Sequence, residues 1–521
     1  MQAMVIGDLL RHSAGRSPER IALIGQESSL TYKEFDRQAD CLANALLGLD
    51  LKKGARVAIL SFNRPEYAIA YFAIARTPYI SVHCSTRSTA AEFGHVLNKT
   101  EVDVLLLESC FLSAVAEVLP ELGRRPRVIV FDVITKGDAG VADAVHIDAF
   151  VRDYPAEPPA FVADESDGFA ITLTGGTTGL PKAVLVSHKA RCASAIASAR
   201  DFGLAENDII IASTPLFHTA GLFVWFGTGV MLGTTTVMPA SWDPLEFMRL
   251  VEKERVSGAF LVPSQLNDLI THPEFSAASL NSLRNVGYAG APMGRALFDR
   301  IQAALPQVTF TENYGQSEAC PITIRRKQHG EAKLGTVGRP ASNAEVGIVD
   351  AGGRFLAPGE VGDIVTRGAQ VFDEYLNDPE ETAKVFRLGN GWVLTGDVGF
   401  LDEEGFLTLV DRSKDMLISG GENVYPAEIE NALYQHEAVS ECAVFGIPDE
   451  RWGEVPAAHV VLAPGRRVSE DELVEFCALK IARFKRPRII AFVDSLPKTP
   501  VGKVQKNLLR DPYWSGQHKC I

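Results

Sequence analysis

The sequence lacks the paired cysteines of a disulfide framework or a zinc site. Its 521 residues include eight cysteines, and no two of them form a C-x-x-C pair. A disulfide-linked scaffold and a structural zinc site are therefore excluded, and a reducing cytoplasm is the expected environment.

Long apolar runs are missing as well. The most apolar stretch, GLFVWFGTGVMLG at 221–233, is too short and too rich in glycine to cross a bilayer. The N-terminal residues have no long apolar core after a basic start, so no signal peptide is expected. Cys520 lies one residue from the end, which does not fit a C-terminal prenylation motif. The sequence predicts a protein without a membrane span.

An excess of positive charge is also missing, because 65 Asp and Glu outnumber 51 Lys and Arg and the net charge is −14. This argues against nucleic acid or an anionic membrane as the main partner. One segment differs: residues 476–510 contain nine Lys or Arg and a single acid, Asp494. Such a segment predicts a small, multiply phosphorylated ligand, and a solvated basic helix is the alternative.

What is present is the pattern of an α/β protein, with about three structural units at roughly 150 residues each. Thr31 and Glu34 form a capping box in front of a helix. Strands are expected at 56–60, 102–108 and 127–132, and an apolar helix at 66–76. This alternation predicts mostly parallel sheets covered by helices.

The C-terminal third has another texture. After about residue 335, short segments with many glycines predict a small antiparallel barrel or sheet. A helix is expected to begin at Pro426, because proline is favoured in the first helical turn. Alternating strands and helices follow, which indicates an α+β unit.

A glycine-rich loop stands in TLTGGTTGLPK at 172–182. Its glycines let backbone N–H groups converge on an anion, and its threonines and Lys182 add donors. Leu180 and Pro181 separate Gly179 from the lysine and Ala183 follows it, so this is not a Walker loop. It does not match G-x-G-x-x-G either. The sequence favours a phosphate-binding loop, and a flexible surface turn is the alternative.

Other dense motifs lie far apart in the sequence. They are PLFHTAG (215–221), GYAGAP (287–292), ENYGQSEAC (312–320), TGDVG (395–399), DRSKDMLISGGENVYPAEIE (411–430) and PKTPVGKVQK (497–506). Each alone has a structural explanation: His218 as a packed histidine, Asp397 as a turn former and Lys503 as a solvated side chain. Together, in this order and at this spacing, they match one pattern.

That pattern resembles the adenylate-forming superfamily, which comprises acyl- and aryl-CoA ligases, adenylation domains of peptide synthetases and beetle luciferases. The resemblance covers essentially the whole chain. DMLISGGEN, DERWGE and FKRPR further resemble the chlorobenzoate–CoA ligase branch. Two positions depart from the usual pattern. The usual Y-G-x-T-E has Ser317 in place of threonine, and the frequent G-R before the hinge is Asp411-Arg412.

The resemblance implies a domain organisation. A large N-terminal adenylation domain is expected at 1–411, with a small β-rich subdomain at 336–411. A hinge follows at 412–414, and a small mobile C-terminal domain at 415–521.

The resemblance also implies two half-reactions that use ATP, Mg²⁺ and CoA. A carboxylate attacks the α-phosphate of ATP, and a thiol then displaces AMP from the acyl-adenylate. The glycine-rich loop would hold the β- and γ-phosphates. The residues implied for ATP are Thr174, Gly175, Gly176, Thr177, Thr178, Gly179, Lys182, Gly290, Ala291, Pro292, Asn313, Tyr314, Gly315, Gln316, Ser317, Asp397, Arg412 and Lys503.

Within that set the resemblance implies individual roles. Tyr314 would stack on adenine, and Asp397 and Arg412 would hold the ribose. Lys503 would reach the substrate carboxylate and the α-phosphate. The residues implied for catalysis are Lys503, His218, Glu318 and the hinge residue Lys414, and those implied for the metal are Glu318 and Thr177.

The other two ligands have their own implied sets. CoA would contact Arg87, Gly420, Gly421, Trp452, Phe484 and Arg486. The acyl pocket would be lined by His218, Thr219, Ala220, Ala289, Gly290, Gly315, Cys320 and Pro321. The stretch from Pro215 to Ala220 has no acid to pair an ammonium group, which favours an acid without an amine.

The sequence therefore predicts a cytoplasmic acid–CoA ligase for an aryl or a short- to medium-chain acid. A free-standing adenylation enzyme that loads a carrier protein is one alternative. A non-catalytic nucleotide-binding protein on this fold is another, while nothing suggests a luciferase-like oxygenase. Nucleic acid is not an expected partner, and a homodimer is left open.

Overall fold

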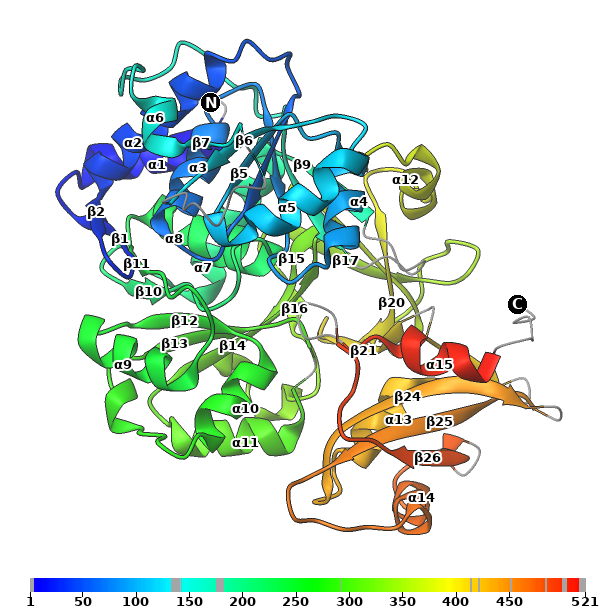
Figure 1. The fold of residues 1–521 in the computed structure, drawn as a ribbon. Coiled ribbons are helices and arrows are strands. Elements are labelled where there is room, and N and C mark those ends of the chain that lie inside the picture. Colours follow the sequence, from blue (N-terminus) through cyan, green and yellow to red (C-terminus); the bar gives the residue numbers. More distant parts are fainter. Residues whose placement is uncertain are drawn as a thin grey trace.

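The computed structural model describes residues 4–132, 141, 143–174, 182–291, 293–412, 415–419, 422–449, 452–482, 485–498 and 504–514. The described chain forms two large sheets, a smaller antiparallel sheet and a C-terminal sheet. Figure 1 shows the C-terminal elements as a separate lobe next to β20 and β21.

An eight-stranded sheet has the order β19-β9-β8-β4-β3-β5-β6-β7. Its strands are β3 (Arg56–Leu60), β4 (Ile80–His83), β5 (Val104–Leu107), β6 (Arg127–Val130), β7 (Val145–His146), β8 (Gly168–Thr174), β9 (Lys182–Ser187) and β19 (Glu374–Tyr375). The central strands β4, β3, β5 and β6 are parallel.

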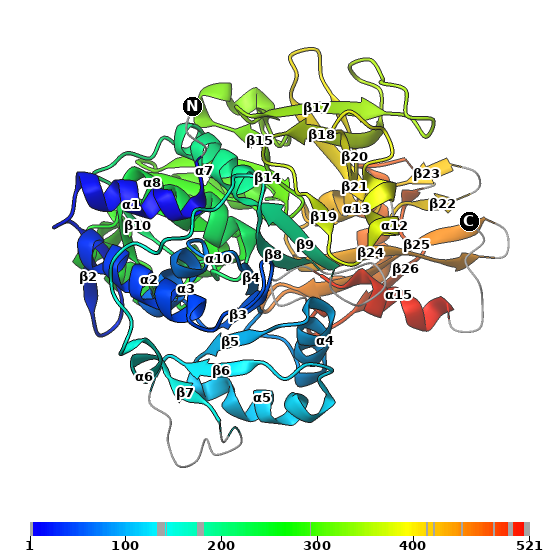
Figure 2. The same ribbon diagram turned by 90° about the horizontal axis from the view of Figure 1, so that it is seen from above.

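Side chains alternate between the two faces of this sheet. Val57 and Ile59 of β3 pack in one core cluster, and Ala58 and Leu60 pack in another. Helices α1 (Ile6–Arg16), α2 (Tyr32–Leu47) and α3 (Pro65–Ile74) contribute to the first cluster, and α4 (Ala90–Thr100) and α5 (Leu112–Val118) to the second. The strands are therefore buried on both faces, and Figure 2 shows helices on the two sides of the sheet.

A nine-stranded sheet has the order β16-β15-β14-β13-β12-β10-β11-β1-β2. Its strands are β1 (Ile21–Ile24), β2 (Ser29–Thr31), β10 (Ile209–Ile211), β11 (Thr235–Val237), β12 (Gly258–Leu261), β13 (Asn285–Tyr288), β14 (Thr309–Gln316), β15 (Ala319–Arg325) and β16 (Arg339–Pro340). The strands from β1 to β14 in this order are parallel, and the strands at both edges are antiparallel.

Helices cover both faces of the second sheet. α9 (Pro244–Glu254), α10 (Pro263–Thr271) and α11 (Arg295–Ala304) pack on one face. α7 (His188–Phe202) and the π-helical segment η4 (Ala220–Phe226) pack on the other, and α8 (Gly227–Leu232) continues from η4. π-Helical turns are rare and occur often at functional sites, and this one directly follows the predicted site residues His218 and Thr219.

The β-rich region expected after residue 335 is an antiparallel sheet in the order β17-β18-β20-β21. Its strands are β17 (Ala344–Val349), β18 (Gly362–Gly368), β20 (Val393–Leu401) and β21 (Leu407–Arg412), and α12 (Pro379–Val385) precedes β20. The C-terminal lobe contains β22 (Leu417–Ser419), β23 (Glu422–Val424), α13 (Pro426–Leu433), β24 (Val439–Asp449), β25 (Gly453–Leu462), α14 (Glu470–Ala478), β26 (Ile489–Phe492) and α15 (Lys506–Trp514).

The predicted α/β class is confirmed, and so are several local signals. Thr31 and Glu34 form the expected capping box at the start of α2, and Pro426 stands in the first turn of α13. None of the described helices is both long and apolar enough to cross a bilayer. The domain boundaries at 411–415 stay a prediction, because Ser413 and Lys414 lie outside the described residues.

Candidate active site

The glycine-rich loop joins two antiparallel strands of the eight-stranded sheet. β8 ends at Thr174, β9 begins at Lys182, and these two residues pair with each other. Both ends of the loop are thus fixed side by side, which suits an anion-binding turn. The predicted residues Gly175, Gly176, Thr177, Thr178 and Gly179 lie outside the described part of the chain.

Lys182 at the loop exit has partners that the sequence did not indicate. Its Nζ lies 2.5 Å from Glu381 Oε2 and 4.7 Å from the ring centroid of Tyr375. Hydrogen bonds from Lys182 and Lys384 lower the pKa of Glu381 to about 2. Glu381 is therefore an anion at neutral pH, and it holds the Lys182 ammonium beside the loop.

Glu318, the predicted metal ligand, is buried at the start of β15, with 8% of its surface exposed. Its Oε1 accepts a hydrogen bond from the Tyr375 hydroxyl at 2.8 Å. Its backbone oxygen accepts one from Phe372 N at 2.7 Å. Because both the carboxylate and the backbone are held, the position of Glu318 is defined by the 372–375 segment.

Tyr314 and Asp397 come together from different sheets. The Tyr314 hydroxyl donates a hydrogen bond to Asp397 Oδ2 at 2.6 Å. Asp397 in turn stands opposite Arg412 in the backbone register of the antiparallel strands β20 and β21. The residues predicted to hold adenine and ribose are thus neighbours, although their assignment to those groups stays a prediction.

Thr219 links β8, the strand before the glycine-rich loop, to the Ser317–Glu318 turn between β14 and β15. Its hydroxyl lies 3.1 Å from Ser317 Oγ and 3.5 Å from Thr172 Oγ1 on β8. Thr219 is buried and the preceding His218 is half-buried. These contacts place Thr219, and His218 beside it, at the junction of the two large sheets, and the role of His218 in the acyl pocket stays a prediction.

The predicted acyl-pocket residues include an apolar group. Ala220 and Ala289 pack against the cluster that contains Cys320 and Trp225. Gly315 is required here by close packing, because a Cβ at this position would lie 2.9 Å from Cys320 Sγ. The bond between Cys320 and Pro321 is cis.

Several residues predicted for ATP lie next to these apolar residues in the sequence. Asn313 Nδ2 lies 3.9 Å from Cys320 Sγ, and Gln316 pairs with Ala319 in the β14–β15 turn. Gly290 has a φ of +90°, which only glycine adopts readily, and Ala291 beside it is exposed. Pro292 lies outside the described residues.

The predicted CoA residues come from three separate elements. Arg87 is exposed in the loop before α4, Trp452 is exposed at the start of β25, and Arg486 is half-buried before β26. Gly420, Gly421 and Phe484 lie outside the described residues. That these residues converge on one ligand stays a prediction.

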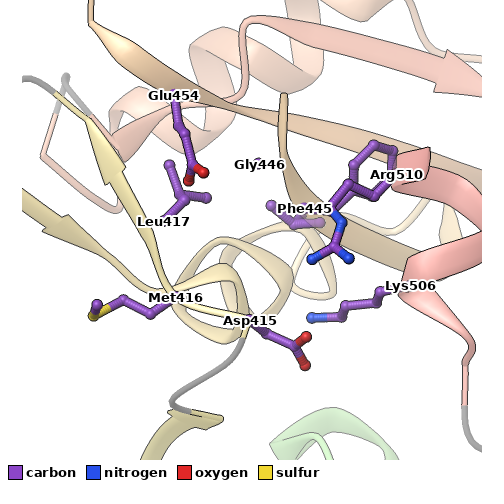
Figure 3. A pocket seen from close by; sticks show the side chains of 9 residues that line it. Asp415, Met416, Leu417, Phe445, Gly446, Glu454, Lys506 and Arg510 are labelled. Atoms are coloured by element: carbon purple, nitrogen blue, oxygen red, sulfur yellow. The ribbon is translucent and has the colours of Figure 1, made fainter. Parts of the chain in front are cut away.

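The two predicted catalytic lysines, Lys414 and Lys503, also lie outside the described residues. Their neighbours border a small cavity of about 10 Å³, lined among others by Asp415, Lys506 and Arg510. Figure 3 shows the Asp415 carboxylate beside the Lys506 side chain, with the Arg510 guanidinium pointing into the same space. This volume holds about one water molecule, so the cavity is not a substrate site.

Sequence reasoning missed three residues beside the site: Tyr375, Glu381 and Arg191. Arg191 on α7 is 1% exposed, and burial lowers its pKa to about 10. Its Nη2 lies 3.4 Å from the Ser317 backbone oxygen, and its guanidinium lies 4.6 Å from the Phe223 ring centroid. Arg191 thus contacts the Ser317–Glu318 turn through the Ser317 backbone oxygen. For Arg191, the one signal in the sequence was an arginine next to small residues in HKARCAS.

Comparisons with known proteins identify the family of the chain. The model of the AMP-binding enzyme family matches residues 10–376, and that of the AMP-binding enzyme C-terminal domain matches residues 428–503. Feruloyl-CoA synthase of Amycolatopsis sp is 34% identical over 498 residues, which cover 95% of this chain and 96% of that protein. Fatty acid–[acyl-carrier-protein] ligase ScoC of Streptomyces coeruleorubidus is 33% identical, with 98% and 96% covered.

A solved structure is similar over the same length. The crystal structure of the anthranilate CoA ligase AuaEII in complex with anthranoyl-AMP matches with a TM-score of 0.90 at 26% identity, over 98% of both chains. The chain belongs to the AMP-binding enzyme family, and thereby to the adenylate-forming superfamily. It is an enzyme of the acid–thiol ligase branch, in which the relatives named above also fall.

Proposed function

We propose that this chain is an ATP-dependent acid–CoA ligase that works in two half-reactions. A carboxylate attacks the α-phosphate of ATP, which gives an acyl-adenylate and releases pyrophosphate. The thiol of CoA then attacks the acyl carbon, which gives the thioester and releases AMP. The observation that carries the proposal is the chain of contacts from Lys182 through Tyr375 to Glu318, because it joins the exit of the glycine-rich loop to the Ser317–Glu318 turn.

The residues divide the first half-reaction among them. Tyr314 and Asp397 would hold the nucleoside, since a carboxylate accepts hydrogen bonds from ribose hydroxyls. Lys182 would meet the departing pyrophosphate, and Lys503 the carboxylate and the α-phosphate. Such groups accelerate phosphoryl chemistry by positioning and by stabilising negative charge where it builds up.

Glu318 fits the role of a magnesium ligand. Mg²⁺ in nucleotide sites is held by one or two carboxylates together with phosphate oxygens. Glu318 offers one oriented carboxylate, and the described residues contain no group of three or more His, Cys, Asp or Glu that could hold a metal without the nucleotide. When bound, the metal would neutralise charge on the phosphates.

CoA is favoured over a carrier protein as the thiol donor. The relatives include a CoA ligase and a carrier-protein ligase, so the family alone leaves both open. The basic segment at 476–510 supports CoA, because Arg486 and its neighbours could pair with the phosphates of a nucleotide. A carrier protein would present a single phosphopantetheine phosphate.

The acid is proposed to be an aryl or a short- to medium-chain carboxylate. The apolar cluster behind Ala220, Ala289 and Cys320 favours a hydrocarbon body. Buried apolar surface of this kind favours an uncharged tail, because a charge there would need a partner. The relative from Amycolatopsis sp is a feruloyl-CoA synthase, which supports an aryl acid as the first class to test.

A pyrophosphate-release assay with a panel of aryl and aliphatic acids tests the proposal. We expect release that depends on acid and ATP, and thioester that appears only when CoA is added. If pyrophosphate release depends on the acid, but the thioester forms with a carrier protein and not with CoA, the carrier-protein alternative is favoured. Binding of ATP without any release would favour a non-catalytic nucleotide-binding protein.

A further inference from the structure

A two-residue strand connects the two sides of the candidate active site. β19 pairs with β9 directly beyond the glycine-rich loop, where Tyr375 stands opposite Val184. On its other side the same segment holds Glu318, whose backbone oxygen accepts the N–H of Phe372 at 2.7 Å. Any movement of β19 would therefore shift the loop exit and Glu318 together.

Tyr375 is the residue of this strand that contacts both the Glu318 carboxylate and the Lys182 ammonium. Its hydroxyl donates to Glu318 Oε1 at 2.8 Å, and its ring lies 4.7 Å from Lys182 Nζ. The side chain has little freedom, because Tyr375 is 6% exposed and its backbone N–H bonds to Thr382 Oγ1 at 3.0 Å. Glu381 holds the same ammonium from a second direction, at 2.5 Å.

We propose that Tyr375 is a positioning residue of adenylate formation. Its hydroxyl fixes the orientation of the Glu318 carboxylate for Mg²⁺, and its ring fixes the Lys182 ammonium for the phosphates. The inference rests on the proposed roles of Glu318 and Lys182 in ATP binding. It adds a single residue that keeps the metal ligand and the loop lysine in register.

Both contacts have a known physical effect. A carboxylate that ligates a metal is usually oriented by a further hydrogen bond, and removal of that bond typically weakens metal binding about 10- to 100-fold. An ammonium over an aromatic face is attracted by the ring quadrupole, which restricts where the lysine can point. Tyr375 combines the two effects, one at its hydroxyl and one at its ring.

The variant Tyr375→Phe separates them, because it removes the hydroxyl and keeps the ring. We expect the Mg²⁺ concentration that gives half-maximal enhancement of ATP binding to rise about 10- to 100-fold. Affinity for ATP without Mg²⁺ should stay within about twofold of the wild type, because the Lys182 contact remains. Isothermal titration of ATP at several Mg²⁺ concentrations, without acid or CoA, measures binding rather than turnover.

The variant Tyr375→Leu removes the ring as well. Affinity for ATP should then fall about two- to fivefold even without Mg²⁺, because the lysine loses its aromatic support. The same affinity for metal-free ATP in the Phe and Leu variants would overturn the part of the inference that concerns the ring.

A matched control comes from Tyr32, whose buried hydroxyl donates to the Thr234 backbone oxygen at 2.7 Å, away from the site. Tyr32→Phe also loses one buried hydrogen bond, and it should lower the melting temperature without changing the Mg²⁺ dependence. The Glu318→Gln variant gives a second control. If Tyr375 acts through the carboxylate, adding Tyr375→Phe to Glu318→Gln should cause no further change in Mg²⁺ dependence.

The outcomes separate this inference from the function on which it rests. If the wild type shows neither Mg²⁺-enhanced ATP binding nor pyrophosphate release, the proposed function is wrong. If the wild type shows both and Tyr375→Phe has the wild-type Mg²⁺ dependence, the positioning role is wrong and the function stands. If Tyr375→Phe and Tyr32→Phe raise the Mg²⁺ concentration for half-maximal enhancement of ATP binding by the same factor, the effect is a general loss of stability. That result would also overturn the inference.

Discussion

The hydroxyl of Tyr314 and the carboxylate of Asp397 are joined by a hydrogen bond of 2.6 Å across 83 positions of the sequence. Tyr314 belongs to β14 of the nine-stranded sheet, and Asp397 to β20 of the antiparallel sheet. The bond therefore joins the antiparallel sheet to the nine-stranded sheet. It also orients a carboxylate that is predicted to accept hydrogen bonds from ribose.

Tyr314→Phe should weaken ATP binding while it keeps the ring for stacking. A hydrogen bond to a charged group is worth about 1.5 kcal/mol or more, so the apparent KM for ATP should rise about tenfold. The KM for CoA should not change. Steady-state kinetics with each substrate varied in turn provide the measurement, and an unchanged KM for ATP would show that the Tyr314 hydroxyl does not orient Asp397 for ATP.

Lys503→Ala should suppress adenylation far more than thioester formation. The charge of Lys503 is needed while carboxylate and phosphate approach each other, and its loss should cost about 3 kcal/mol or more, a hundredfold in rate. Synthetic acyl-adenylate should restore thioester formation. An equal fall in both half-reactions would contradict the assigned role.

Lys414→Pro should leave pyrophosphate release nearly intact and block thioester formation. Proline fixes φ, so the hinge could not adopt its second conformation. Single-turnover assays of each half-reaction measure the effect. Normal thioester formation by this variant would place the hinge elsewhere.

Arg486→Ala should raise the apparent KM for CoA about ten- to a hundredfold, as expected for the loss of a charged hydrogen bond of about 1.5 to 3 kcal/mol. The KM values for ATP and for the acid should stay the same. Dephospho-CoA should suffer less from the substitution if Arg486 binds the 3′-phosphate. The same CoA dependence in variant and wild type would make the 476–510 segment a solvated surface and favour the carrier-protein alternative.

His188 should make stability depend on pH. Its Nδ1 accepts the Ile6 N–H in the core, and burial lowers its pKa to about 4. The unfolded chain binds this proton near pH 6.5. The contribution of neutral His188 to the free energy of unfolding is therefore fully present above about pH 6.5. It is lost as the pH falls towards 4, by about 1.4 kcal/mol per pH unit at most.

The variant His188→Asn tests this, because Asn Oδ1 can accept the same N–H without titrating in this range. The decrease in melting temperature from pH 7.5 to 5.5 should be smaller in the variant than in the wild type. Equal decreases would show that His188 does not contribute in this pH range.

The sequence predicted the parts of the fold that depend on local patterns. The helix after Thr31, the strand at 56–60 and the helix at Pro426 follow from capping, apolar runs and proline placement. The motif residues Tyr314, Asp397 and Glu318 were found through their resemblance to a family. Their mutual contacts were not predicted, because they depend on the packing of separate sheets.

The partners of Lys182 and Glu318 show most clearly which contacts could not be predicted from the sequence. Glu381 lies 199 positions from Lys182, and Tyr375 lies 57 positions from Glu318. Both partners stand in DEYLNDPEET, which reads as a short polar segment with no motif of its own. The pairing of β19 with β9 brings this segment to the loop, and no periodicity encodes that pairing.

In the proposed function, one site makes an acyl-adenylate and then a thioester. The most direct test of this function is to incubate the protein with an aryl acid panel and ATP, first without and then with CoA, and to quantify pyrophosphate, AMP and acyl products by mass spectrometry. We expect enzyme-bound acyl-adenylate and about one equivalent of pyrophosphate before CoA is added, and stoichiometric AMP and acyl-CoA afterwards. ADP and inorganic phosphate in place of AMP and pyrophosphate, with no acyl-adenylate for any acid, would contradict the proposed function.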